Sequence, residues 1–202
     1  QHKPEYVQHC LYNEYPRIAQ RARAENGEIQ WGDETGMRSD SHAGRSYAPI
    51  GETPVRLVSG SRFSTNMIST VTNRGKLRFM LYRETLTAPV LIRFLSRLIR
   101  DAQGRKVFLI LDNLRVHHSK KVSAWVGDRK EQIELFFLPA YAPELNPDEY
   151  LNCDLKHQVR TGLPARNQDE LERRVRSVMR RLQLRPQRIR SYFRHPRIAY
   201  AA

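Results

Sequence analysis

The sequence predicts an α/β fold in which a mixed sheet of five strands carries helices on both faces. Two β-rich runs, 64–73 and 76–82, flank a turn that ends in Gly75, which predicts an antiparallel hairpin because glycine readily takes a positive φ. Continuous apolar runs at 107–111 and 133–138 are typical of buried parallel strands. Amphipathic helical patterns between and after these runs complete the α/β arrangement.

The N-terminal quarter of the chain is expected to contain a helix and the first strand. Residues 4–26 show an amphipathic helical pattern, which Gly27 interrupts. Apolar and more polar residues then alternate as in a strand, with Asp33 at its C-terminal end. The following segment, 35–55, is rich in Gly, Ser, Arg and Pro, and it predicts an irregular loop with an exposed basic surface.

Four further helices are predicted from the periodicity of apolar residues. Two of them would connect strands of the sheet, and the other two lie near the C-terminus. Their ranges are 87–101, 119–127, 169–182 and 186–193.

The segment 135–156 combines a strand, a stiff loop and the start of another helix. Prolines punctuate the loop, and each restricts its own φ and the conformation of the residue before it. Asn146 is a favourable N-cap and Pro147 suits the first helical position. Glu149 then falls in the first turn, where the helix dipole favours negative charge. An ordinary capped helix explains this pattern unless other carboxylates meet Glu149.

The chain carries a strong excess of positive charge, with a formal net charge of +14 at pH 7. The excess is uneven, because residues 153–202 contain thirteen Lys and Arg against four Asp and Glu, which is nine of the fourteen net charges. A polyanionic partner is the natural inference, and nucleic acid is favoured over a membrane surface. Arginine dominates this region, and its planar side chain suits phosphate contacts.

Cysteine content and hydropathy restrict the class of protein further. Only Cys10 and Cys153 occur, which argues against a disulfide framework or a zinc module and fits a reducing compartment. No apolar run is long enough for a membrane span, and the first residues lack the apolar segment of a signal peptide. We therefore expect a cytoplasmic, bacterial and nucleoid-associated protein without a membrane partner.

Three acids are expected to converge at one edge of the sheet. Asp33 and Asp112 end or follow separate strands, where open α/β sheets place ligands, and Glu149 enters on a helix beside them. Three such carboxylates repel one another unless divalent cations are bound, and Mg²⁺ (or Mn²⁺) accepts carboxylate, water and phosphate oxygens. Two such ions per site support phosphoryl transfer. Together with the basic surface, this predicts a metal-dependent polynucleotidyl nuclease or transferase.

Three blocks of the sequence combine acids with characteristic neighbours, namely WGDETG (31–36), LILDNLRVHHS (109–119) and LPAYAPELNPDEYLNCDLK (138–156). In sequence and in order, they resemble the catalytic core of IS630/Tc1/mariner-type DDE transposases. The resemblance implies an RNase H-like fold and a two-metal mechanism. It also implies that Asp33, Asp112 and Glu149 are the catalytic and metal-binding triad.

The resemblance also suggests how the chain is divided. We expect a helical linker or N-terminal extension (1–27), an RNase H-like DDE core (28–160) and basic C-terminal helices packed on that core (161–202). The helix-turn-helix region of such transposases does not occur in this sequence, so we expect a catalytic domain with at most part of the linker. The implied partners are double-stranded DNA, as transposon ends and as target, and a second copy of the chain in a homodimer.

The last block departs from the family pattern in one position and contains rivals for the third acid. The tryptophan often found three residues after that acid is Asn152 here, which predicts a less firmly packed helix. Asp148 is adjacent to Glu149, but its side chain would point about 100° away on the helix. Glu34 and Asp154 are weaker rivals on the same argument.

Accessory and DNA-contacting residues are predicted around the triad. His117 follows the Asp-Asn pair as a histidine does in the family, where it would contact the scissile phosphate or a metal-bound water. The alternative is a histidine that only caps the next helix or packs at the surface. Asn113 is expected to position the loop after Asp112. The side chains predicted to contact DNA are Arg38, Arg45, Lys156, Arg173, Arg180 and Arg188.

The predicted activity is DNA strand cleavage followed by attack of the freed 3′-OH on target DNA. Two alternatives stay open. The first is an RNase H-like nuclease or resolvase that hydrolyses DNA without strand transfer. The second is a catalytically inactive DNA-binding derivative of a transposon.

Overall fold

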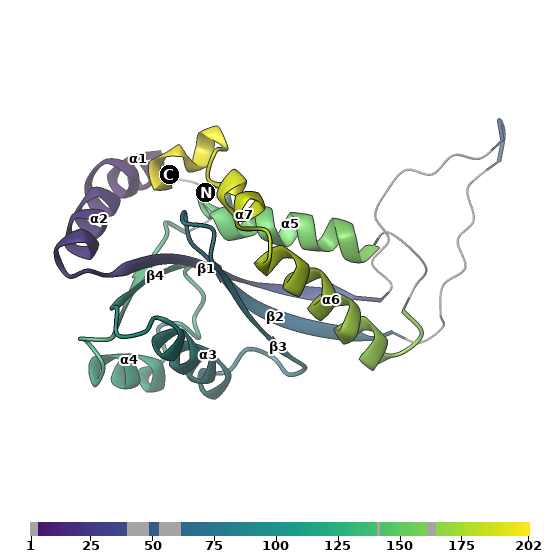
Figure 1. Ribbon diagram of the computed structural model, residues 1–202, viewed down its shortest axis with the longest axis horizontal. Coiled ribbons are helices and arrows are strands. Elements are labelled where there is room, and N and C mark those ends of the chain that lie inside the picture. The colour runs from purple at the N-terminus through teal and green to yellow at the C-terminus, as the bar shows by residue number, and fades with distance from the viewer. Residues whose placement is uncertain (1–3, 40–48, 53–61, 141, 161–164) are drawn as a thin grey trace.

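A computed structural model describes residues 4–39, 49–52, 62–140, 142–160 and 165–202, and it contains one five-stranded sheet. The strands lie in the order β3-β2-β1-β4-β5 (Figure 1). β1, β4 and β5 are parallel, whereas β2 runs antiparallel to both β1 and β3. The predicted mixed sheet is therefore confirmed. The strands are β1 (Glu28–Arg38), β2 (Ser64–Val71), β3 (Leu77–Tyr82), β4 (Val107–Leu111) and β5 (Ile133–Phe137).

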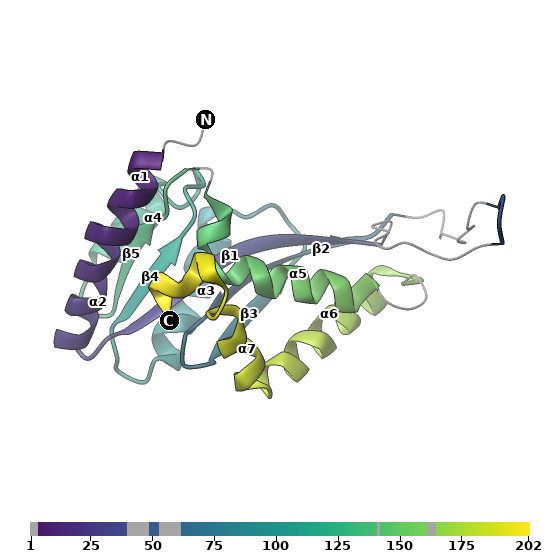
Figure 2. The ribbon, with the colours of Figure 1, turned by 90° about the horizontal axis from the view of Figure 1, so that it is seen from above.

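Helices cover both faces of the sheet, as predicted, and each face has its own apolar core. On one face, α3 (Ala88–Asp101) and α4 (Lys120–Gly127) bury residues such as Phe94 against the strands. On the other face, α5 (Pro147–Arg160), α6 (Gln168–Gln183) and α7 (Pro186–Tyr192) pack around Trp31 and its neighbours. Figures 1 and 2 show the two helical layers with the sheet between them.

The N-terminal helical segment packs on the core. α1 (Pro4–His9) continues through a π-helical turn (Cys10–Glu14) into α2 (Tyr15–Ala24), in agreement with the helix predicted over 4–26. Arg21 of α2 forms an ion pair with Glu134 of β5 at 2.7 Å, and the ring of Tyr15 lies 5.9 Å from that of Trp31. These contacts attach the segment to the parallel half of the sheet.

The C-terminal segments close the same face. After α7, a short 3-10 helix (Pro196–Ala201) follows, and the ring of Phe193 lies 5.1 Å from that of Trp31. The hairpin turn between β2 and β3 contacts the start of α7, because a Cβ built on Gly75 would lie 2.6 Å from the carbonyl oxygen of Pro186. Gly75 also has a φ of 88°, so the turn needs glycine for two reasons.

The first strand is longer than predicted. We expected it to end at Asp33 and an irregular loop to begin at residue 35, but β1 continues to Arg38. The reason is antiparallel pairing with β2, which extends to Arg38 opposite Ser64. Asp33 therefore lies within the strand and not at its end. The rest of the predicted loop, 40–48 and 53–55, is outside the described residues.

No helix in the described part of the chain is both long enough and apolar enough to span a membrane.

Candidate active site

The loop that precedes α5 is attached to the strand that carries Asp33. It contains a 3-10 turn (Pro143–Leu145) followed by the buried Asn146. The side-chain oxygen of Asn146 accepts a hydrogen bond from the backbone N–H of Asp148 (3.0 Å), which confirms the predicted N-cap. The amide of Asn146 donates to the carbonyl oxygen of Gly32 (2.9 Å). The start of α5 is therefore held against β1, next to Asp33.

Asp33, Asp112 and Glu149 line one cleft, although they come from three separate segments. Asp33 lies on β1, Asp112 directly follows β4, and Glu149 lies in the first turn of α5. The cleft has a volume of about 390 Å³, and apolar residues make up much of its lining. These apolar residues are Leu114, Leu138, Pro139, Ala140, Ala142 and Pro143.

Asp33 is the most deeply buried of the three acids, with 8% of its surface exposed. It faces α5 because it lies two residues after Trp31, on the same side of the strand. Burial and the nearby charge of Glu149 raise the pKa of Asp33 to about 8, since both disfavour its charged form. Without a cation, Asp33 is therefore mostly protonated at neutral pH.

The donor set of the cleft suits a hard divalent cation. Its three acids offer only oxygen ligands, which Mg²⁺ and Mn²⁺ prefer. A cation between Asp33 and Glu149 would also remove the repulsion that raises the pKa of Asp33. The residues therefore fit the metal ions that the family resemblance implies.

Asn152 contradicts the expectation of a loosely packed helix. Its side chain is 1% exposed, and its amide donates a hydrogen bond to Oδ2 of Asp33 at 2.8 Å. The helix is firmly packed here because a buried polar contact takes the place of an aromatic side chain. Sequence reasoning noted Asn152 but missed its role, because only the tertiary fold brings it to Asp33, 119 positions away.

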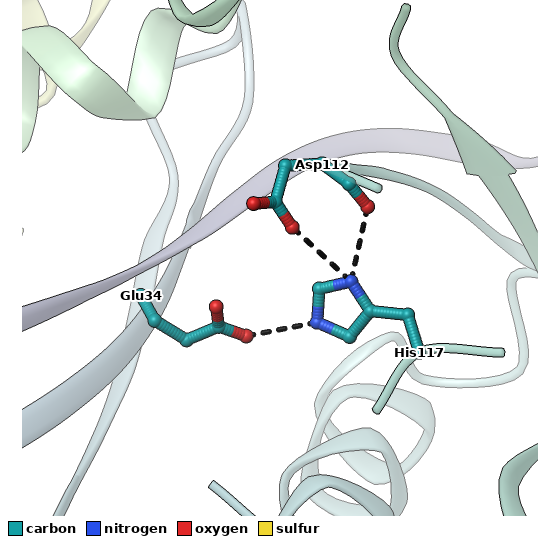
Figure 3. Close-up of side chains that lie close together, drawn as sticks. All are labelled: Glu34, Asp112 and His117. Atoms are coloured by element: carbon teal, nitrogen blue, oxygen red, sulfur yellow. Dashed lines mark hydrogen bonds and ion pairs between the residues drawn. The ribbon is translucent and has the colours of Figure 1, made fainter. Parts of the chain in front are cut away.

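His117 lies between two acids, as Figure 3 shows. Its Nε2 is 2.8 Å from Oε1 of Glu34, and its Nδ1 is 3.0 Å from the backbone oxygen and 3.2 Å from the carboxylate of Asp112. Burial lowers the pKa of His117, but the hydrogen bonds to Asp112 and Glu34 outweigh it and raise the pKa to about 10. Both ring nitrogens are occupied, which favours a positioning role over direct contact with a phosphate.

Glu34, Asp112 and His117 lie within 4.8 Å of one another, yet their geometry is that of an ion-pair chain. The two ring nitrogens of an imidazole point in different directions. Each of them faces a different carboxylate here, so one ion could not be bound by all three residues. Glu34, which sequence reasoning treated as a weak rival for a triad position, is thus a partner of His117 on the face of β1 opposite to Asp33.

The two other rival acids have partners of their own. Asp148 is fully buried and accepts a hydrogen bond from the hydroxyl of Ser69 at 2.7 Å. Burial and the charge of Asp33 raise the pKa of Asp148 well above its usual range. Burial also raises the pKa of Asp154, but hydrogen bonds from Arg188, Tyr192 and Gln158 outweigh it and lower that pKa. Neither acid is among the residues that line the cleft.

Asn113 and the basic side chains predicted to contact DNA occupy different surroundings. Asn113 is exposed and lines the cleft beside Asp112. Arg173 and Arg180 are exposed on α6, and Lys156 is half-buried on α5. Arg188 on α7 forms an ion pair with Asp154 at 2.8 Å. Of the other two, Arg38 is exposed at the end of β1, and Arg45 lies outside the described residues.

Residues 28–172 match the sequence model of a family described as DDE superfamily endonuclease. The fold is similar to that of the Mos1 mariner paired end complex with Mn, at a TM-score of 0.65 and 16% identity over 98% of this chain and 63% of that one. The Mos1 Strand Transfer Complex matches at a TM-score of 0.63 and 16% identity over 100% of this chain and 63% of that one. A structure of the Mos1 transposase catalytic domain and Raltegravir with Mg matches at a TM-score of 0.61 and 15% identity. The match covers 100% of this chain and 98% of that one.

At these identities the likeness shows the fold, which is the RNase H-like fold of the Mos1 catalytic domain. The chain spans 63% of the length of the Mos1 protein in the paired-end and strand-transfer complexes. A comparison with curated proteins gave no match.

Proposed function

Because the chain belongs to the DDE superfamily of endonucleases, we propose that it is the catalytic domain of a Tc1/mariner-type DNA transposase. Its substrates would be double-stranded DNA at the transposon ends and at the target. The observation that carries this proposal is the cleft in which Asp33, Asp112 and Glu149 meet. The strong positive charge of the chain supports a DNA substrate.

The proposed cofactors are two divalent cations per site, Mg²⁺ or Mn²⁺. Asp33 and Asp112 would hold one of them, and Glu149 would complete the site of the second. When bound, such ions activate the attacking oxygen and stabilise the leaving oxygen of a phosphodiester. Calorimetric titration of the protein with Mn²⁺ tests the number of ions, since a single equivalent would contradict the two-ion site.

The residues around the triad are proposed to hold the acids in place while two reactions occur. In cleavage, water attacks the phosphodiester and its P–O3′ bond breaks, which leaves a 5′-phosphate and a free 3′-OH. In strand transfer, that 3′-OH attacks a phosphodiester of the target, and the target's own 3′-OH leaves. His117 orients Asp112 through Nδ1, and Asn113 positions the loop at the mouth of the cleft. Asn146 fixes the approach of the helix that carries Glu149. No covalent enzyme intermediate is required.

The basic C-terminal region is proposed as the phosphate-binding surface. Its expected contributors are Lys156, Arg173, Arg180 and Arg188, and we expect Arg38 and Arg45 of the N-terminal half to add to it. Arg188 would have to leave Asp154 or bind phosphate beside it. The protein would act as a homodimer on DNA in the bacterial cytoplasm, where the free thiols of Cys10 and Cys153 persist. Light scattering of the protein with and without transposon-end DNA measures the oligomeric state.

The decisive experiment incubates the full-length protein with transposon-end DNA and Mg²⁺ or Mn²⁺. We expect nicked DNA first, and joined product when a precut end with a free 3′-OH is supplied together with target DNA. Hydrolysis without joined product would favour the nuclease or resolvase alternative. DNA binding with neither reaction, in the presence of either metal, would favour the inactive derivative.

A further inference from the structure

Asn152 has no role in the proposed reaction so far, although it contacts one of the three acids. It lies one helical turn after Glu149 on α5, and positions three apart share a face of a helix. Its amide donates to Oδ2 of Asp33 at 2.8 Å, while Asp33 lies in the middle of β1. The hydrogen bond therefore joins the two elements that carry two of the three acids of the cleft.

The geometry leaves one oxygen of Asp33 for the cleft. A carboxylate has two oxygens, and the Asn152 amide occupies Oδ2 from the buried side. Asp33 nevertheless lines the cleft together with Asp112 and Glu149. Fixing one oxygen in this way determines where the other points.

Stability alone does not explain an asparagine at this position. Its side-chain oxygen Oδ1 is buried and has no hydrogen-bond partner among the described residues. A buried polar atom without a partner destabilises a fold, whereas an apolar side chain of the same size would not. The benefit of Asn152 therefore lies in what its amide does to Asp33.

We propose that Asn152 is a positioning residue, which sets the orientation of the Asp33 carboxylate relative to Glu149 for binding a divalent cation. The inference rests on the proposed function, because it assumes that the cleft binds metal. Asn152 itself touches neither the metal nor DNA in this scheme. It acts through Asp33.

The test replaces Asn152 by leucine, which has a similar size and removes both the amide donor and the unpaired oxygen. Mn²⁺ binding is titrated by electron paramagnetic resonance without DNA, so that the readout does not depend on activity. We expect Asn152→Leu to weaken Mn²⁺ binding by about ten- to a hundredfold, as is usual when a residue that supports a metal ligand is removed. Raising the Mn²⁺ concentration should restore part of its DNA cleavage, which it should not do for Asp33→Asn.

Gln158→Ala provides a matched control on the same helix. Gln158 also donates its amide to an aspartate, Asp154, at 2.9 Å, but neither residue lines the cleft. We expect its Mn²⁺ affinity to equal that of the wild type. Asn152→Ala serves as the second variant if the leucine variant does not fold, with the same expected loss of affinity.

Three results separate the inference from its premise. Wild-type protein that binds no Mn²⁺ would overturn the proposed function and this inference with it. Normal Mn²⁺ affinity in the wild type, in Gln158→Ala and in a folded Asn152 variant would overturn the positioning role alone. A loss confined to the Asn152 variant, with partial rescue of cleavage by Mn²⁺, supports it.

Discussion

The two sides of the cleft hold their acids by different means. On the β1–α5 side, Asp33 and Glu149 are close enough for the charge of Glu149 to raise the pKa of Asp33. The neutral amide of Asn152 supports Asp33, which is 8% exposed. On the β4 side, Asp112 has a side chain that is 41% exposed and contacts the imidazole of His117. The β1–α5 side therefore holds its acid by burial and a neutral hydrogen-bond donor. The β4 side holds its acid by an ion pair that is more exposed to solvent.

This difference determines where a cation stabilises the site most. An imidazolium partly balances the negative charge of Asp112, because the pKa of His117 is raised to about 10. An amide supplies a hydrogen bond but no net charge, so without a cation Asp33 escapes repulsion from Glu149 only by keeping its proton. A metal ion relieves that repulsion, which makes the β1–α5 side the more dependent on metal.

Removing an acid should have the largest effect on strand cleavage, and this effect should be the same on both sides of the cleft. Asp33→Asn, Asp112→Asn and Glu149→Gln are each expected to abolish metal-dependent strand cleavage, because each removes a proposed metal ligand. DNA binding, measured by mobility shift, should be retained. Cleavage at the wild-type rate by any one variant would remove that residue from the site.

Removing the ion pair should have the next largest effect and should act on the β4 side. His117→Ala is expected to lower the cleavage rate by about ten- to a hundredfold, because the Asp112 carboxylate loses its orienting partner. His118→Ala is the matched control, since His118 is exposed and contacts Asn113 but none of the three acids. Equal losses in both variants would contradict the special role of His117.

In the metal-free protein, the two sides of the cleft should affect the free energy of unfolding over different pH ranges. Between about pH 4 and pH 8 the folded state holds a proton on Asp33 that the unfolded chain releases, so stability falls as the pH rises through this window. His117 stays protonated in the folded state up to about pH 10, so the stability that it contributes falls later, between about pH 6.5 and pH 10.

Asp33→Asn should therefore lose less stability than the wild type between pH 4 and pH 8 in the presence of a chelator. A difference of about 1 kcal/mol would appear as a shift of about 2–4 °C in the midpoint of thermal unfolding. Added Mn²⁺ should stabilise the wild type and leave the variant unchanged. Parallel pH profiles for the two proteins would show that Asp33 ionises normally in the fold.

The smallest effect is expected outside the cleft, on the exposed face of α6. Arg173→Ala and Arg180→Ala should each weaken DNA binding modestly, because each removes one expected phosphate contact. Each should also reduce the slope of the logarithm of the binding constant against the logarithm of the salt concentration by about one. Arg97→Ala is the control on α3, on the opposite face of the sheet. If Arg97→Ala weakens binding as much, the DNA-binding surface is not on the α6 face.

Local patterns were sufficient to predict most of the fold. The apolar runs of β4 and β5, the hairpin at Gly75 and the periodicity of α3 and α6 match the structure, because each depends on neighbours in the sequence. The end of β1 was predicted wrongly for the opposite reason. Residues up to Arg38 remain in a strand only because β2 pairs with them, and that partner comes from a distant segment.

The same division holds for the site. From the sequence by itself, strand ends and the family resemblance predicted the three acids, and local backbone chemistry determined the prolines and the N-cap that deliver Glu149. Only the tertiary structure decided what holds the acids: Asn152 behind Asp33, His117 between Glu34 and Asp112, and Ser69 beside Asp148. Apart from the contact of His117 with Asp112, which lies five residues before it, each of these contacts joins segments that are far apart in the chain. A hydrogen bond of this kind depends on the packing of helix on sheet, and no local pattern in the sequence encodes it.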